Sequence, residues 1–515
     1  MRGSARRRYC SWSAKAAWLG ICPILLTVPF SKGASQTPPA QEQIQQMIAA
    51  SANLERGEIG FEFVDTNTGE VLAQQNASKL FTPASNTKLY TTALAFVRLG
   101  ITYTFKTSVR TSATLTTGES VVPDLTFVAG GDPNLSGRVL PYSVLPNHND
   151  PLTAIAKLAD QIAAKGIKQV NGNLMADDSR YPYDPYPDGW TFDDGTWSYG
   201  APVSAFSVND NSVHVTVRSS EPGELADVQL DPDFGHFVVL NQVVSDESNQ
   251  AKVKISRPPG SNELVITGTI GRKPPTAEED VAVADPALFA AEALKYELEE
   301  RGVSVQGEAQ AVHRDLTTVP DPLGAPRIAT LPQGSELASL ESAPLFEAVQ
   351  IVNKVSQNLH AEMLLREVAY ATRSVGTLAA GLDERKNFLV EAGIPEKTYV
   401  FGDGSGLARQ ALTSPAATVA LLRYMWNRPE KQAWIDSLPI GGVDGTLKNR
   451  FKDVEGADRV HAKTGSLAHV AALSGYLQTE SGRWLIFSMM ANAELNDGDQ
   501  VQKFFDQACG VFLRQ

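Results

Sequence analysis

One stretch of the chain places a nucleophile and a base one helical turn apart. Ser85 is followed three residues later by Lys88, in the only Ser-x-x-Lys of the 515-residue sequence. A serine hydroxyl becomes a useful nucleophile only beside a base, and a lysine can be that base if burial or nearby positive charge lowers its pKa. The same pattern also fits a serine that caps a helix, with an exposed lysine one turn later. The pair therefore needs partners from elsewhere in the chain.

Two short polar motifs downstream supply such partners. Ser356 and Asn358 form a Ser-x-Asn motif in helical sequence, and Lys463-Thr464-Gly465 occurs once in the chain. Ser-x-Asn also occurs at 51–53, ahead of the Ser-x-x-Lys, and at 207–209, in a strand-rich stretch. The motif at 356–358 is preferred, because it lies in helical sequence near a helix junction and downstream of the strand-rich stretch.

The elements around Ser85 favour a buried setting. Residues 57–64 and 71–73 alternate as the strands of a hairpin, and a helix is predicted from Leu89 to Leu99, closed by Gly100. That helix has little polar surface, so we expect it to be buried. Its N-terminus also adds partial positive charge that favours an anion nearby.

The sequence changes in character between residues 103 and 340, where short strand-like runs alternate with turns. Helices are predicted at 151–165 and 286–301, each with proline near its start and glycine past its end, and each is followed by a similar short strand. That similarity hints at related units. The Trp-, Tyr-, Asp- and Pro-rich stretch 181–204 is predicted to be a loop, and the proline-rich stretch 316–333 a linker.

Helical periodicity returns at Pro344, and strands follow near the C-terminus. We expect helices at 344–370, 377–392, 415–426 and 500–513, a glycine-rich loop at 401–407, and strands at 459–463, 471–477 and 484–490. The predicted fold class is α+β, with an antiparallel sheet that uses strands from both chain ends and is flanked by helices. Residues 36–102 and 341–515 then form one catalytic domain, and 103–340 are a large β-rich insertion of two small domains.

The first 35 residues have the pattern of a secretory signal peptide. Four arginines and Lys15 precede the mostly apolar stretch 16–30, and small residues follow at 33–35. An uncleaved signal anchor is the alternative. Cys10 and Cys22 would leave with the signal, so only Cys509 would remain, and an internal disulfide framework is excluded. We expect a periplasmic or extracellular protein with at most peripheral membrane contact.

The composition excludes one broad class of partner. The chain is 43% hydrophobic and 20% charged, which is ordinary for a globular protein, and its net charge is −13. A nucleic-acid-binding surface would be basic, so no nucleic-acid partner is expected. His360 and His469 lie near the motifs but are interpreted as structural, and Cys509 is interpreted as a core residue.

The three motifs, in this order, resemble those of the penicilloyl serine transferases, the penicillin-binding proteins and serine β-lactamases. Several further stretches resemble the low-molecular-mass class C penicillin-binding proteins, the D-Ala-D-Ala carboxypeptidase/endopeptidases of peptidase family S13; they are 131–135, 199–205, 209–211, 403–407 and 445–447. The 267 residues between Lys88 and Ser356 also fit that family, which carries extra domains there, whereas β-lactamases have a far shorter gap. The chain departs from the family pattern at Gln357, where the residue is often Asp.

The resemblance implies a role for each motif residue. Ser85 attacks the substrate carbonyl and forms an acyl-enzyme, and Lys88 takes its proton. Ser356 relays that proton to the leaving amine, and Asn358 orients Lys88 or the substrate. The segment Lys463-Thr464-Gly465-Ser466 is implied in substrate binding. Lys463 lowers the pKa of Lys88 and attracts the terminal carboxylate of the substrate, and Thr464 hydrogen-bonds that carboxylate. The backbone N–H of Ser466 completes an oxyanion hole with the backbone N–H of Ser85.

Two loop residues are implied in substrate selection. Asp194 and Tyr199 fall where family members have a pocket for the side chain of the stem peptide, whose charged end would suit Asp194. A loop-bracing carboxylate and a core tyrosine are the alternative reading.

The sequence thus predicts an exported serine-type D-Ala-D-Ala carboxypeptidase, with possible DD-endopeptidase activity, that acts on peptidoglycan stem peptides and is acylated by β-lactams. No metal or cofactor is expected. A β-lactamase or esterase on the same fold, and a non-catalytic wall-binding protein, are the alternatives.

Overall fold

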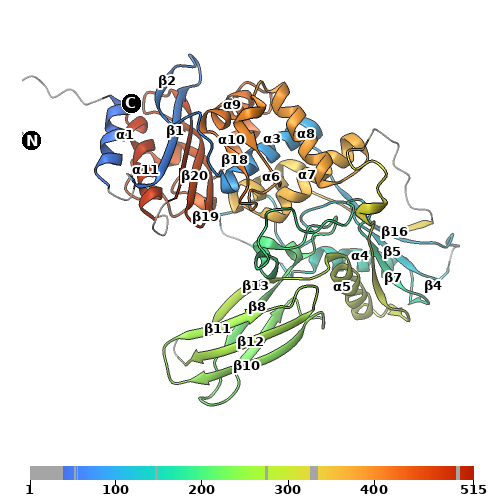
Figure 1. Ribbon diagram of the computed structural model, residues 1–515. Coiled ribbons are helices and arrows are strands. Elements are labelled where there is room, and N and C mark those ends of the chain that lie inside the picture. The colour runs from blue at the N-terminus through green and yellow to red at the C-terminus, as the bar shows by residue number, and fades with distance from the viewer. Residues whose placement is uncertain are drawn as a thin grey trace, which may run out of the picture. The chain divides into compact units, whose positions relative to one another are not determined.

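The computed structural model describes residues 39–51, 54, 56–116, 118–144, 149–272, 276–324, 334–493 and 499–515 (Figure 1). The predicted signal peptide at 1–35 lies outside these residues. None of the described helices is both long and apolar enough to span a bilayer.

The central sheet joins the two ends of the chain. Its strand order is β19-β20-β21-β1-β2, from Val460–Leu467, Val470–Gln478, Trp484–Asn492, Glu58–Asp65 and Val71–Gln75. All neighbours are antiparallel, and β1 pairs with β21 along its whole length, from Glu58 opposite Asn492 to Asp65 opposite Leu485. The predicted antiparallel sheet with strands from both chain ends is confirmed.

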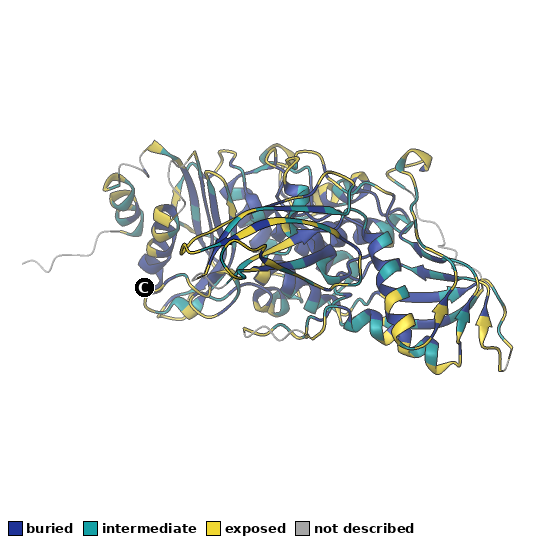
Figure 2. Ribbon diagram, turned by 90° about the horizontal axis from the view of Figure 1, so that it is seen from below, coloured by how far each residue is buried: buried dark blue, intermediate teal, exposed yellow. Residues whose placement is uncertain are grey.

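Helices cover both faces of this sheet, because its strands are apolar on both sides. Phe63 of β1 faces α1 (Ala40–Ala49) and α11 (Asp499–Leu513), and its ring stacks on Phe512 at 4.4 Å. The next residue, Val64, belongs to the opposite core, with α3 (Thr87–Leu99), α9 (Pro415–Trp426) and α10 (Lys431–Asp436). Strands β20, β21 and β1 and the inner helix faces are largely buried, whereas the edge strand β2 is mostly open to solvent (Figure 2). Cys509 is fully buried on α11, as predicted.

The helical region after the insertion contains a break at the second motif. Helix α6 (Leu345–Gln350) continues into a π-helical turn, Ile351–Val355, and α7 runs from Asn358 to Arg373, followed by α8 (Leu378–Glu391). Between them Ser356 adopts a left-handed conformation, with φ 67° and ψ 32°. Gln357 then caps α7, because its side chain accepts a hydrogen bond from Leu359 N at 3.0 Å. Ser356 therefore lies outside both helices, at the junction between them.

Two similar αββ units contribute strands to the same two sheets in the inserted region. Helix α4 (Thr153–Ala164) leads to β6 and β7, and α5 (Pro286–Glu300) leads to β14 and β15; β6 pairs in parallel with β14, and β7 with β15. The similarity seen in the sequence thus corresponds to equivalent places in the sheets. The strand orders are β15-β7-β5-β3-β16 (Ala309–Val312, Leu174–Asp177, Leu125–Val128, Lys106–Thr111, Ser335–Glu341) and β14-β6-β4 (Ser304–Val305, Gln169–Val170, Val121–Val122).

Residues 212–282 form two further three-stranded sheets. Their orders are β13-β8-β9 (Ala277–Ala282, Ser212–Arg218, Asp227–Asp231) and β10-β12-β11 (Val238–Asp246, Glu263–Gly271, Ala251–Ser256). These strands are yellow-green in Figure 1.

The segments near the motifs are mostly irregular. Loop 181–204 has only two single 3-10 turns, η2 (Asp194–Thr196) and η3 (Ser198–Gly200), as predicted for a loop. The glycine-rich loop 401–407 lies between the short strands β17 (Tyr399–Val400) and β18 (Leu412–Thr413). Other 3-10 turns are η1 (Ala84–Asn86), η4 (Asn209–Asn211), η5 (Leu316–Thr318), η7 (Glu396–Thr398), η8 (Gly445–Leu447) and η9 (Ala457–Arg459).

Candidate active site

Ser85 lies in a tight turn at the start of a buried helix. It occupies the 3-10 turn η1, directly ahead of α3, and the preceding residue Ala84 is left-handed with φ 47°. The glycine-rich loop packs against this turn so closely that a Cβ on Gly406 would lie 1.9 Å from the carbonyl oxygen of Ala84. Gly406 also has φ +84°, so both space and conformation require glycine there.

Lys88 is fully buried beside Ser85. Its Nζ donates to Ser85 Oγ at 2.9 Å, to Asn358 Oδ1 at 2.5 Å and to the carbonyl oxygen of Ser405 at 2.8 Å. Burial lowers the pKa of Lys88 to about 7, against the opposing charges of Asp403 and Glu362, which raise it. A lysine with this pKa is present in both forms at neutral pH, and the neutral form can accept a proton.

Lys463 approaches from the edge strand β19. Its Nζ donates to Ser356 Oγ at 2.8 Å and to the carbonyl oxygen of Thr464 at 2.9 Å. Burial, and then the charge of Lys88, lower the pKa of Lys463 well below its usual value. Burial is the largest cause that lowers the pKa of Lys88, and the expected contribution of Lys463 to it stays a prediction.

One cavity of about 260 Å³ opens onto the motifs. It is lined by Ser85, Ser356, Thr446, Arg450, Thr464, Ser466 and Gln502. Four of these were predicted site residues, so all three motifs meet at one surface. Thr446 was signalled only by the 445–447 stretch, and Thr464 Oγ1 donates to its Oγ1 at 2.8 Å. No sequence signal pointed to Arg450, which forms an ion pair with Asp506 at 2.6 Å, or to Gln502 of α11.

The third motif needs a glycine at position 465, because there is no space for a side chain there. A Cβ at this position would lie 2.5 Å from the carbonyl oxygen of Pro83 and 3.2 Å from Asn86 N. Strand β19 therefore lies directly against the turn that carries Ser85. Asn86 Nδ2 also donates to Ser474 Oγ on β20 at 2.8 Å, which ties the turn to the sheet.

A partly buried carboxylate in the inserted region, Asp210, contacts the second motif. Asp210 accepts from Gln357 Nε2 at 3.0 Å and pairs with Arg138 at 2.5 Å and with His360 at 2.8 Å. Burial would raise the pKa of Asp210, but the positive charges of Arg138 and His360 lower it well below its usual value. Gln357, the departure from the family pattern, thus has a positioning role, and His360 is structural as predicted.

The competing Ser-x-Asn motif at 207–209 does not line the cavity. Ser207 Oγ donates to the carbonyl oxygen of Pro133, and Asn209 Nδ2 to that of Ser212. The 51–53 motif is only partly within the described residues, since 52 and 53 lie outside them.

Asp194 and Tyr199 lie beside the motifs but do not line that cavity. The carbonyl oxygen of Tyr199 accepts from Asn358 Nδ2 at 2.7 Å, while its side chain is 47% exposed. Asp194 is buried and accepts from Thr191 N at 2.8 Å. Burial, and then the charge of Asp194, raise the pKa of Tyr199.

A third residue of this loop reaches the motifs through a buried carboxylate. Trp190 Nε1 donates to Asp403 Oδ2 at 3.1 Å. Asp403 is fully buried, and it also accepts from Gly406 N and Ala408 N. Loop 181–204 is thereby anchored to the glycine-rich loop next to Lys88. Within the described ranges, no three His, Cys, Asp or Glu side chains are grouped so as to hold a metal ion.

The chain is similar to several known proteins. The model of the D-Ala-D-Ala carboxypeptidase 3 (S13) family matches residues 40–513. The D-alanyl-D-alanine carboxypeptidase of Actinomadura sp. (strain R39) is 32% identical over 509 residues, covering 95% of this chain and 88% of the relative. D-alanyl-D-alanine carboxypeptidase DacB of Haemophilus influenzae is 26% identical over 452 residues, covering 85% and 86%.

A solved structure has the same fold. The crystal structure of penicillin binding protein 4 from Haemophilus influenzae matches with a TM-score of 0.77 at 22% identity, covering 92% of this chain and 99% of that chain. A second structure of that protein, in complex with a β-lactam, matches with a TM-score of 0.71.

Proposed function

The chain belongs to the D-Ala-D-Ala carboxypeptidase 3 (S13) family, and we propose that it is an exported serine DD-peptidase that releases D-alanine from peptidoglycan stem peptides. One observation carries this proposal. The fully buried Lys88, with a pKa of about 7, lies 2.9 Å from Ser85 Oγ at the wall of an open cavity. A base in that state is suited to activate a serine.

In the acylation step, Ser85 Oγ attacks the carbonyl carbon of the penultimate D-Ala while its proton passes to neutral Lys88. Asn358 orients Lys88, because its Oδ1 accepts from Nζ at 2.5 Å. The ester to Ser85 forms, the peptide bond breaks, and the leaving amine of the terminal D-Ala needs a proton. Ser356 relays to this amine the proton that Lys88 took from Ser85, so Lys88 is neutral again, and the Ser356 hydroxyl is oriented by Lys463 Nζ at 2.8 Å.

Lys463 and Thr464 bind the terminal carboxylate of the substrate. The pKa of Lys463 is lowered by burial and by Lys88. A bound carboxylate favours the charged ammonium, so substrate binding raises the pKa of Lys463 again. The hydroxyl of Thr464, at the cavity wall, donates to the same carboxylate.

The backbone N–H groups of Ser85 and Ser466 form the oxyanion hole. Support comes from the close approach of Gly465 to the Ser85 turn and from the presence of both serines at the cavity wall. Losing one such donor costs about 10²–10³ in rate in other enzymes. Water then hydrolyses the ester, and neither metal nor cofactor takes part in any step.

The finer assignments complete the proposal. Asp194 and Tyr199 bind the charged side chain of the stem peptide, since the Tyr199 carbonyl contacts Asn358. Residues 36–102 and 341–515 are the catalytic domain and 103–340 the insertion, which the shared sheet of β1, β2 and β19–β21 supports. β-Lactams acylate Ser85, and residues 1–35 direct export.

Covalent labelling with fluorescent penicillin tests the nucleophile. Wild-type protein is expected to label, Ser85→Ala to lose all labelling, and the matched control Ser481→Ala, an exposed serine on the β20–β21 turn, to label fully. Retained labelling of Ser85→Ala would refute the assignment. D-Alanine release from a pentapeptide must accompany labelling, since its absence points to a wall-binding protein.

Two further measurements separate the related activities. Slow hydrolysis of the penicilloyl ester is expected, whereas fast turnover would favour a β-lactamase. Cleavage of cross-linked muropeptide dimers would add DD-endopeptidase activity.

A further inference from the structure

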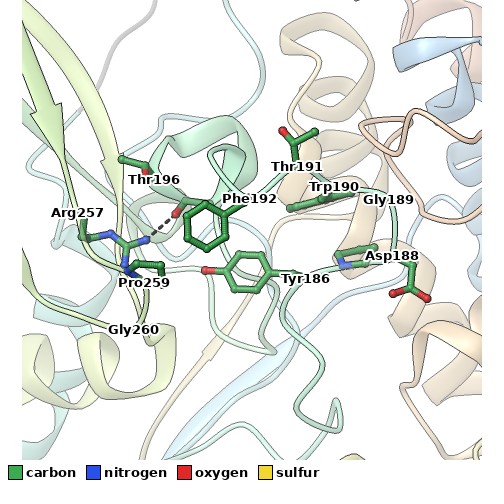
Figure 3. Close-up of a pocket in the computed structure, with 12 residues that line it drawn as sticks. Tyr186, Asp188, Gly189, Trp190, Thr191, Phe192, Thr196, Arg257, Pro259 and Gly260 are labelled. Atoms are coloured by element: carbon green, nitrogen blue, oxygen red, sulfur yellow. Dashed lines mark hydrogen bonds between the residues drawn. The ribbon is translucent and has the colours of Figure 1, made fainter.

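A second cavity lies where loop 181–204 meets the inserted sheets. It has a volume of about 420 Å³, within the range of small-ligand sites. One wall is the loop, with Tyr186, Trp190 and Phe192, and the other is the turn after β11, with Arg257, Pro259 and Gly260 (Figure 3). Nothing in the function proposed above uses this cavity.

Arg257 is a buried cation without an anionic partner. It is 7% exposed, and among the described residues no carboxylate forms an ion pair with it. Its Nη1 and Nη2 donate to the carbonyl oxygens of Ser261, at 3.3 Å, and Gly195, at 2.5 Å. Its Nε is buried without any hydrogen-bond partner. An unpaired buried charge is costly, so this arginine indicates an anion that is absent here.

The aromatic side chains beside Arg257 are unusually open to solvent. Phe192 is 84% exposed and Tyr186 41% exposed. Both rings lie close to the arginine in Figure 3, whereas the one acidic side chain of the lining, Asp188, lies at the opposite end. The cavity thus offers a cation and apolar surface together, which suits a carboxylate attached to an apolar group.

A short series of hydrogen bonds links the wall of this cavity to the residues around Lys88. Trp190, in its wall, donates to Asp403. Two residues further, the carbonyl oxygen of Ser405 accepts from Lys88 Nζ. Asp188 is held to the same loop region, because its carbonyl oxygen accepts from Gln410 Nε2 at 3.2 Å. Loop 181–204 therefore lines this cavity and also contacts the glycine-rich loop beside Lys88, so one peptide lying along the loop could occupy both places.

We propose that this cavity is a second substrate site, in which Arg257 pairs with a carboxylate of the stem peptide ahead of its D-Ala-D-Ala end and Phe192 and Tyr186 cover the adjoining apolar part. The assignment rests on the function proposed above. It gives the inserted region a specificity role, since the arginine comes from the β11–β12 turn and the scissile bond lies at Ser85.

Two pentapeptides that end in D-Ala-D-Ala test the proposal. They differ only in one residue ahead of that end, which is glutamic acid in one peptide and glutamine in the other. Wild-type kcat/KM is expected to be about tenfold to a hundredfold higher for the acid, the range of a charge-assisted hydrogen bond. Arg257→Gln is expected to bring the ratio to about one. Arg257→Lys should keep part of it, because lysine retains the charge but not the guanidinium geometry.

Matched variants separate this role from a structural one. Arg272→Gln removes an exposed arginine of the same region, paired with Glu221, and should leave the acid-to-amide ratio unchanged. Phe192→Ala should raise KM for both peptides equally, because both have the apolar part. Penicillin labelling shows whether each variant is folded.

A ratio of one in the wild type, or an undiminished ratio in Arg257→Gln, would overturn the second site while leaving the Ser85 assignment intact. If the wild type neither releases D-alanine from either peptide nor reacts with penicillin, the proposed function itself fails, and the second site fails with it.

Discussion

Two buried lysines in this protein, Lys88 and Lys354, differ in whether a carboxylate contacts the ammonium group. Lys88 is fully buried and its Nζ contacts only neutral oxygens, on Ser85, Asn358 and Ser405. Lys354, 3% exposed and two residues before Ser356, donates to Asp444 Oδ2 at 2.7 Å and to the carbonyl oxygen of Leu438 at 2.7 Å. The first has a pKa of about 7, and the second forms an ion pair.

The difference teaches that pairing, not burial alone, separates reactive from structural lysines here. Asp444 compensates the charge of Lys354, so this pair fixes the segment 438–445 beneath the break in helices α6 and α7. Lys88 has no carboxylate in direct contact, and the more distant charges of Asp403 and Glu362 offset only part of the effect of burial, so its neutral form becomes accessible near neutral pH. Arg257 shares the unpaired condition, but a guanidinium stays charged and therefore needs an anion instead.

The largest expected effect comes from removing the unpaired lysine. Lys88→Met should slow acylation by penicillin by about 10²–10⁴-fold, the usual contribution of a general base. Its thermal unfolding midpoint should change less than that of Lys354→Met, because no carboxylate loses a partner. Stopped-flow labelling and calorimetry measure the two effects, and near-normal acylation would remove Lys88 from the mechanism.

Removing the paired lysine should reduce stability more than removing Lys88 does. Lys354→Met leaves Asp444 buried without a cation, so the free energy of unfolding should fall by about 3–5 kcal/mol. Urea denaturation of wild type and variant measures the loss. The double variant Lys354→Met/Asp444→Leu should recover part of it, and an unchanged stability of the single variant would contradict the comparison.

The pKa of Lys88 gives a pH dependence of known direction. Only neutral Lys88 accepts the proton of Ser85, so the acylation rate should rise with pH through about 7 and fall about tenfold per unit below it. Rates of penicillin acylation between pH 5.5 and 8.5 test this. A midpoint near the usual value for lysine would mean that burial does not set the pKa.

The smallest effect is expected from an ion pair in solvent. Lys79 pairs with Glu58 at 3.1 Å, with side chains 58% and 48% exposed. Lys79→Met should change the free energy of unfolding by no more than about 1 kcal/mol. Measured in the same denaturation series, it is the surface reference for Lys354→Met, and a comparable loss would show that burial is irrelevant.

Local sequence patterns predicted most elements well. Pro415 begins α9 and Trp426 ends it, as proposed from the Ser-Pro start. The three C-terminal strands lie at the predicted places, although β19 continues past Lys463 to Leu467. The break in helical sequence at Ser356 was also predicted. Such features depend on nearest neighbours, which a sequence displays directly. The short helix α10 and the line of hydrogen bonds from Asp210 to Gln357 were missed, since tertiary contacts hold them.

The sequence alone determined which residue types meet, because two serines, two lysines and an asparagine in three ordered motifs leave few alternatives for their chemistry. Only the tertiary structure decided their state. It showed that burial lowers the pKa of Lys88, that Gly406 and Gly465 bring two distant segments against the Ser85 turn, and that Arg257 lies unpaired beside loop 181–204. These properties depend on which atoms shield a group from water and on which residues distant in sequence come into contact, and local sequence patterns reveal neither.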